Sequence, residues 1–130
     1  MADEALSIRN AHARRAAGAM SALAHSTSDG RSVSPPEATM LLSKVAETLL
    51  RMSDSLRGIG NGLRQSLQTH GVAGPDGEPA DVALVRAQAL LQNAADAAAM
   101  IVDDVWRARD GVAPFGVTRL PGRSDDAVSF

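Results

Sequence analysis

Leucine recurs at every seventh position between residues 42 and 63, and this spacing constrains the fold more than any other feature of the sequence. A second apolar series alternates with the leucines at intervals of three and four residues. The combined row comprises Leu42, Val45, Leu49, Met52, Leu56, Ile59 and Leu63. Such alternation is the heptad pattern of helices that pack against other helices. It predicts a long amphipathic helix that buries this row against a partner helix.

The flanking residues give this helix the range 35–69. Ser34 is a good helix cap, Pro35 suits a first helical position, and Glu37 stands where the acid of a capping box is found. The segment THGVAGPDGE at positions 69–78 has the glycine and proline content of a turn. A strong start signal and a turn therefore bound the helix.

Three glycines near the end of this helix, Gly58, Gly60 and Gly62, allow two interpretations. An interior glycine costs ~1 kcal/mol of helix stability relative to alanine, so three of them can mark a hinge. Alternatively the helix continues, and the glycines let a neighbouring backbone approach closely. Other small residues flank the apolar row and favour the second interpretation, namely Ala46, Thr48, Ser53 and Ser55.

A second amphipathic helix is predicted over residues 79–110. Its apolar residues again recur at intervals of three and four, with large and small side chains interleaved. The large ones are Leu84, Leu91, Ile101 and Val105, and the small ones are Ala87, Ala94, Ala98 and Ala108. Asp103 and Arg107 lie on the polar side with the i,i+4 spacing of an ion pair. The short turn before this helix favours an antiparallel hairpin.

The sequence thus predicts an all-α fold centred on a long antiparallel helical hairpin in residues 34–111. A weaker helix over 3–24 is expected within the N-terminal segment 1–33, because Arg9 interrupts its apolar face. Residues 112–130 show neither helical nor strand periodicity and are expected to form an extended or flexible tail. Since a hairpin alone buries one seam, we expect a three-helix bundle or a dimeric four-helix bundle.

Composition narrows the classes of function. The net charge of −2 lacks the basic surplus of nucleic-acid-binding proteins. The absence of cysteine excludes thiol catalysis and thiolate metal sites. No apolar run approaches the ~20 residues of a membrane span, and no signal-peptide stretch is present. A cytoplasmic location is expected, and secretion without a signal peptide stays open.

The two predicted helices differ in charge. Residues 34–70 carry four cations and three acids, a net of +1, whereas residues 71–110 carry three arginines and seven acids, a net of −4. The difference favours pairing of unlike helices, although salt screens exposed charges.

No cluster of residues indicates catalysis, a cofactor or a metal ion. The three histidines lie in separate segments without a second ligand at helical spacing. The glycine segment interrupts a helical heptad, whereas a phosphate-binding loop follows a strand. We therefore expect no catalytic residue, no cofactor and no small-molecule substrate. Besides the apolar rows, the expected partner contacts are Arg9, Arg14, Arg15, Trp106, Phe115 and Leu120.

The end of the second predicted helix carries Trp106 and, four residues later, Asp110. A helical hairpin with this ending resembles the small substrates of type VII secretion, whose secretion signal is Tyr-x-x-x-Asp/Glu. The resemblance implies a secreted helical hairpin with Trp106 and Asp110 as its signal. The chain departs from that family in three respects, because Trp replaces Tyr, the turn lacks Trp-x-Gly, and a further helix precedes the hairpin.

The expected function is that of a non-enzymatic interaction or assembly protein, a scaffold, adaptor or structural subunit. It would act through heptad-patterned helix packing, by self-association or by binding another helical protein. Two alternatives stay open at this point. One is the secreted hairpin substrate, and the other is a regulatory nucleic-acid-associated factor that uses Arg9, Arg14 and Arg15.

Overall fold

The computed structural model describes residues 2–69 and 71–117, and these residues form three helices. They are α1 (Ala2–Thr27), α2 (Pro35–Thr69) and α3 (Asp81–Val112), and the described part of the chain contains no β-strand. The predicted all-α class is therefore confirmed. The chain divides into two compact units between Val33 and Ser34, with α1 in the first and α2 and α3 in the second.

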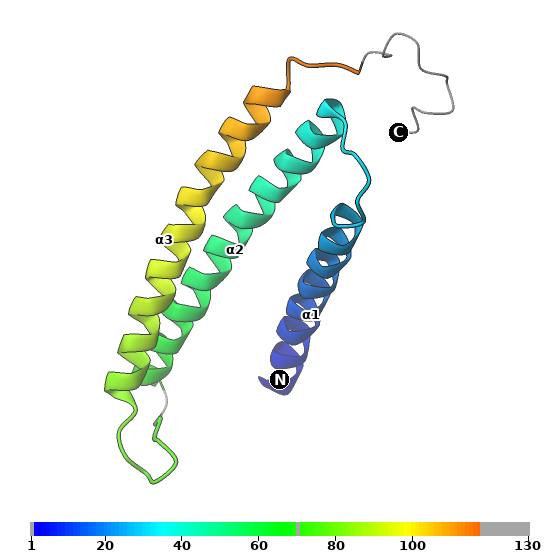
Figure 1. Cartoon of the computed structure of the whole chain (residues 1–130). Coiled ribbons are helices and arrows are strands. Elements are labelled where there is room, and N and C mark those ends of the chain that lie inside the picture. Colours follow the sequence, from blue (N-terminus) through cyan, green and yellow to red (C-terminus); the bar gives the residue numbers. More distant parts are fainter. Residues whose placement is uncertain (1, 70, 118–130) are drawn as a thin grey trace. The chain divides into compact units, whose positions relative to one another are not determined.

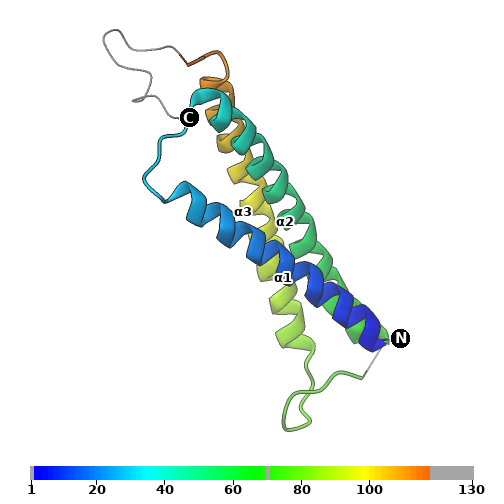
Figure 2. The same ribbon diagram turned by 90° about the vertical axis from the view of Figure 1, so that its right-hand side faces the viewer.

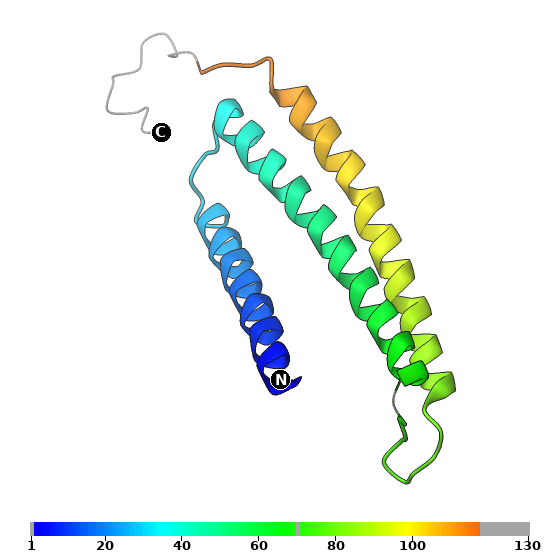
Figure 3. The same cartoon turned by 180° about the vertical axis from the view of Figure 1, so that it is seen from behind.

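Helices α2 and α3 form the predicted antiparallel hairpin. The two helices pack closely and lie side by side along their length, joined at one end by a loop (Figures 1 and 3). In the view turned by 90°, α2 and α3 overlap, so the hairpin is a single layer of two helices (Figure 2). The core of this unit must therefore lie along the line where the two helices meet.

Helix α2 begins where the sequence predicts. The Ser34 hydroxyl accepts a hydrogen bond from the backbone N–H of Glu37 at 3.3 Å, and the Ser34 carbonyl accepts one from Ala38 at 2.8 Å. These bonds satisfy N–H groups that a helix start leaves without an intrahelical partner. The helix then continues without a break through Gly58, Gly60 and Gly62 to Thr69.

The loop between the helices delays the start of α3 from the predicted residue 79 to Asp81. Pro79 forms an antiparallel bridge with Ala73, and the Gly74 N–H donates to the Glu78 carbonyl at 2.6 Å, so this segment closes on itself before the helix starts. Gly77 has a φ of 81°, which favours glycine over residues with a side chain. At its other end α3 runs to Val112, two residues beyond the prediction.

Helix α1 extends to Thr27, three residues past the predicted end at residue 24. Three hydroxyl groups form hydrogen bonds with helix carbonyls at this end. Ser26 and Thr27 donate to the Leu23 carbonyl, each at 2.9 Å, and Ser28 donates to the Ala24 carbonyl at 2.6 Å. The Ala24 carbonyl is one of the last four of the helix, which have no intrahelical partner, so the Ser28 bond satisfies it.

The buried centre of the hairpin consists of small residues. Ala46, Ser53 and Gly60, seven residues apart on α2, are buried, and so are Ala95, Ala98 and Val102 on α3. The larger side chains between them are half-buried. We call the combined set the seam, which on α2 comprises Leu42, Ala46, Leu49, Ser53, Leu56, Gly60 and Leu63, and on α3 comprises Leu84, Gln88, Leu91, Ala95, Ala98, Val102 and Val105.

About half of the residues in each predicted apolar row lie outside the seam. The leucines of α2 lie in it as expected, but Met52 and Ile59 are 45% and 57% exposed, and the residues that follow them are buried instead. On α3, Ile101 is 51% exposed, and Val102 takes its place. Val45 is half-buried beside the buried Ala46.

The physical reason for this correction is close approach of the two backbones. A Cβ atom added to Gly60 would lie 3.3 Å from Gln88 Cγ and 3.5 Å from Leu91 Cβ. At Gly60 this separation leaves little room for a side chain, and the other buried positions of α2 hold the small residues Ala46 and Ser53. Small residues at a helix contact thus displace large ones from its centre.

Candidate interaction surface

A buried hydroxyl fixes the register of the hairpin. Ser53 is 1% exposed, and its Oγ donates a hydrogen bond to the carbonyl of Ala95 at 2.8 Å, so residues 42 positions apart in sequence are joined across the seam. The position of Gly60 against Gln88 shows the same register one heptad further along α2. Because the helices are antiparallel, seven residues forward on α2 correspond to seven residues back on α3.

Arg57 extends this contact to the surface. Its Nη1 donates to Ser53 Oγ at 3.0 Å, and its Nη2 donates to Asp96 Oδ1 at 2.9 Å. Gln92 Nε2 donates to the same carboxylate oxygen at 3.1 Å. The polar chain therefore runs from a buried backbone carbonyl through Ser53 and Arg57 to an exposed carboxylate. Sequence reasoning missed it, although Ser53 and Arg57 are one helical turn apart.

These bonds change the acidity of one group. The hydrogen bond from Arg57 lowers the pKa of Asp96 below its ordinary value of 3.8, and the bond from Gln92 acts in the same direction. Both favour the ionised carboxylate. The ion pair joins α2 to α3 at the surface, where solvent and salt weaken such pairs.

The polar chain also identifies the two sides of the hairpin. Arg57, Gln92 and Asp96 each directly follow a seam residue, and they meet on one side. Residues that directly precede a seam residue must therefore lie on the other side. On the first, charged side, six of fourteen such positions hold an ionised residue, namely Glu47, Asp54, Arg57, Arg64, Asp96 and Asp103.

The other side of the hairpin is nearly free of charge. We call it the apolar side, and it consists of Leu41, Val45, Thr48, Met52, Ser55, Ile59 and Gly62 on α2, and Ala83, Ala87, Leu90, Ala94, Ala97, Ile101 and Asp104 on α3. Asp104 is its one ionised member. Met52, Ile59, Leu90 and Ile101 are 45%, 57%, 62% and 51% exposed. Exposed apolar side chains gathered on one face are typical of interaction surfaces.

The other expected partner contacts lie elsewhere. Arg9, Arg14 and Arg15 are exposed on α1. Trp106 is 38% exposed on the charged side of α3, and Phe115 follows that helix and is 64% exposed. Leu120 lies outside the described residues. The predicted ion pair between Asp103 and Arg107 is confirmed, at 2.9 Å.

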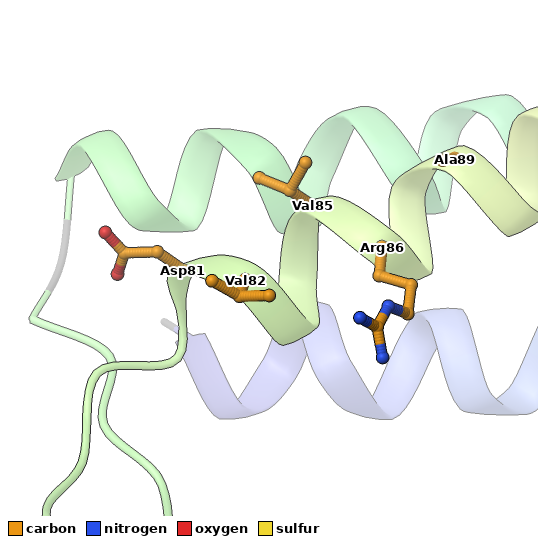
Figure 4. Close-up of a pocket in the computed structure, with 5 residues that line it drawn as sticks. All are labelled: Asp81, Val82, Val85, Arg86 and Ala89. Atoms are coloured by element: carbon orange, nitrogen blue, oxygen red, sulfur yellow. The ribbon is translucent and has the colours of Figure 1, made fainter.

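A small apolar patch lies on the first turns of α3, on the charged side (Figure 4). Its lining consists of Asp81, Val82, Val85, Arg86 and Ala89. Val82 and Val85 are exposed, and the Asp81 and Arg86 side chains point in different directions, to the left and downward in Figure 4. A small-molecule site normally encloses its ligand and brings polar groups together, and this patch does neither.

Within residues 2–69 and 71–117, no three side chains of the kinds that bind metals are grouped into a site. None of the three helices combines the length and the hydropathy that a membrane crossing requires, over the same described residues. Comparison of the chain with protein-family models, with curated proteins and with solved structures finds no match.

Proposed function

We propose that this protein is a non-enzymatic interaction protein that acts by presenting the apolar side of its α2–α3 hairpin to another helical surface. One observation carries the proposal. The apolar side holds exposed Met52, Ile59 and Ile101, and a single charged residue, while the opposite side is charged. Burial of apolar area drives most protein association, at about 25 cal/mol for each Å².

The pattern along α2 and α3 supports a helical occupant. Large exposed side chains such as Ile59 and Leu90 lie near small ones such as Gly62 and Ala94. A surface of this kind accepts the ridges of another helix between its own. A scaffold, adaptor or structural subunit is the role that such a surface serves.

The test measures the size of the assembly that contains the protein in gently lysed cells of its native host. Wild type should elute as a particle larger than one chain of 13.5 kDa. Ile59→Arg should shift it to the size of one chain, because arginine would place an unpaired charge in the buried contact. Met40→Arg, outside the apolar side on the same helix and 72% exposed, is the matched control and should leave the size unchanged. Wild type that elutes as one chain contradicts the proposal.

A secreted hairpin substrate is the second candidate. Trp106 and Asp110 are exposed and one turn apart near the end of α3, the second arm of the hairpin. Removal of residues 106–130 should then abolish appearance of the protein in the culture medium. An unchanged distribution between cells and medium would exclude this function.

A further inference from the structure

We propose that the occupant of the apolar side is a second copy of this chain, related by a twofold axis that runs along the hairpin. The inference rests on the proposed function and names the partner. In this arrangement α2 of each copy packs on α3 of the other, and two hairpins form a four-helix bundle. The supporting observation is that Lys44 and Asp104 lie at the same position along the hairpin but on its opposite edges.

We call two residues level when they lie at the same position along the axis of the hairpin. The register of the two helices determines which residues are level. Ser53 lies against Ala95 and Gly60 against Gln88, so Ala46 is level with Val102, and Lys44 is level with Asp104. Lys44 lies on the outer edge of α2, where its Nζ also pairs with Glu47 Oε2 of the same helix at 3.2 Å. Asp104 lies toward the outer edge of α3. Within one chain both helices separate these two residues, so they do not pair.

The twofold axis brings them together. Rotation about an axis parallel to the helices places α3 of the second copy over α2 of the first without changing the level of any residue. Asp104 of the second copy then reaches Lys44 of the first at the rim of the contact. Symmetry repeats the pair on the opposite rim. The one charge on the apolar side thus meets an opposite charge.

The charges of the whole helices favour the same arrangement. Helix α2 carries four cations and three acids, a net of +1, and α3 carries three arginines and five aspartates, a net of −2. An axis along the hairpin stacks each helix on one of opposite sign. An axis across the hairpin stacks α3 on α3 and α2 on α2, which opposes like charges.

The first measurement is the mass of the purified full-length chain by sedimentation equilibrium. We expect a dimer. Ile101→Arg should raise the dissociation constant by a factor of about ten or more, because the new charge would be buried in the contact. Met100→Arg is the matched control, since Met100 is the preceding residue, is 75% exposed and points away from both sides. Its dissociation constant should not change, and circular dichroism should show that both variants keep their helices.

Should Ile101→Arg unfold, Ala94→Glu repeats the test at an exposed position on the same side. A separate pair of variants tests the predicted contact between Lys44 and Asp104. Asp104→Lys alone should raise the dissociation constant by a factor of about two to ten, and adding Lys44→Glu should restore it.

Cross-linking determines the axis, and the absence of cysteine makes single substitutions informative. Ala87→Cys lies on the apolar side near the turn and should join to its symmetry mate through a short bismaleimide. With an axis across the hairpin, the two sites would lie about 30 Å apart, since they are about ten residues from the middle of α3. Arg86→Cys, on the outer edge, is the control and should not cross-link.

Three results would overturn the inference. They are a monomer at every concentration, equal weakening by Ile101→Arg and Met100→Arg, and a dimer in which Ala87→Cys fails to cross-link. The proposed function is tested separately. A purified monomer that still enters a larger assembly through Ile59 in its host would refute the second copy and leave the interaction role standing. A lone chain in both settings would refute both.

Discussion

Gly60 and Ser53 determine how closely α2 and α3 approach, because both lie in the buried centre of the seam. Gly60 has no side chain to separate the helices, and Ser53 supplies the hydroxyl that pairs with the Ala95 carbonyl. A larger apolar residue at either position would push the backbones apart. These two small residues therefore set how near the two backbones come at this part of the seam.

Gly60→Leu should lower the free energy of unfolding by about 1–3 kcal/mol, because its first side-chain atom already meets Gln88 Cγ at 3.3 Å. Gly58→Ala is the control within the same helix. A Cβ at Gly58 meets nothing within 4 Å, so this change should raise stability by about 0.5–1 kcal/mol through helix propensity. Urea denaturation measures both. Equal effects would mean that Gly60 is not a contact point.

Ser53→Ala should cost about 1 kcal/mol of unfolding free energy, since it removes a buried hydrogen bond across the hairpin. Ser55→Ala serves as the comparison, because Ser55 is exposed on the same helix and alanine is compatible with it. Its effect should stay within about 0.5 kcal/mol of zero. A Ser53→Ala variant as stable as wild type would show that the register does not depend on this hydroxyl.

At the scale of the helix, two neighbouring sets of residues could share the buried contact with the leucines of α2. The residues at 45, 52 and 59 are larger and more apolar than those at 46, 53 and 60, and sequence alone favours the larger set. The structure selects the smaller set for the seam and leaves the larger one on the apolar side. Each helix thus carries two contact faces that share one pattern.

Leu56→Ala and Met52→Ala distinguish the two faces at a protein concentration low enough for monomers. Leu56 is in the seam, and its truncation should cost about 2 kcal/mol, which is less than for a fully buried leucine because it is half-buried. Met52 lies outside the seam, and its truncation should cost less than about 1 kcal/mol. Chemical denaturation of the two variants compares them directly. A reversed order would contradict the seam and place Met52, rather than Leu56, in the main contact between the two helices.

The contact between Arg57 and Asp96 gives the hairpin a pH dependence. Because the pKa of Asp96 is lowered in the folded chain, the unfolded chain takes up the proton first as the pH falls. The contribution is therefore present above about pH 4 and is lost as the pH falls through the lowered pKa. Asp96→Asn and Arg57→Gln should each flatten the loss of stability between about pH 5 and pH 2, as followed by thermal melts across pH. A wild-type profile in both variants would contradict the role of this pair.

At the scale of the whole molecule, the hairpin has a charged side and an apolar side. Both sides expose apolar side chains, but the apolar side has a single charged residue beside its exposed Met52, Ile59 and Ile101. Contact of these side chains with water is unfavourable. Within the described residues, no three potential metal ligands are grouped into a site.

Covering that surface should make stability depend on concentration. If two copies associate through the apolar side, the thermal midpoint should rise by a few degrees for each tenfold increase in protein concentration, because association stabilises the folded state. Ile101→Arg should remove this dependence, and Met100→Arg should keep it. Differential scanning calorimetry over a wide concentration range measures the effect. A constant midpoint for wild type would contradict association.

The sequence by itself determined the helical class, the hairpin and the start of α2 at Pro35, since these follow from local spacing, the Ser34 cap and a turn rich in glycine and proline. It also placed the leucines of the heptad in the contact. Only the tertiary structure decided which neighbouring row completes the seam, because that choice depends on how near two backbones come. A Cβ added to Gly60 would lie only 3.3 Å from Gln88 Cγ, and this close approach favours small residues in the seam. The spacing of leucines is visible in the sequence of one helix, whereas the distance between two helix backbones depends on how both helices pack.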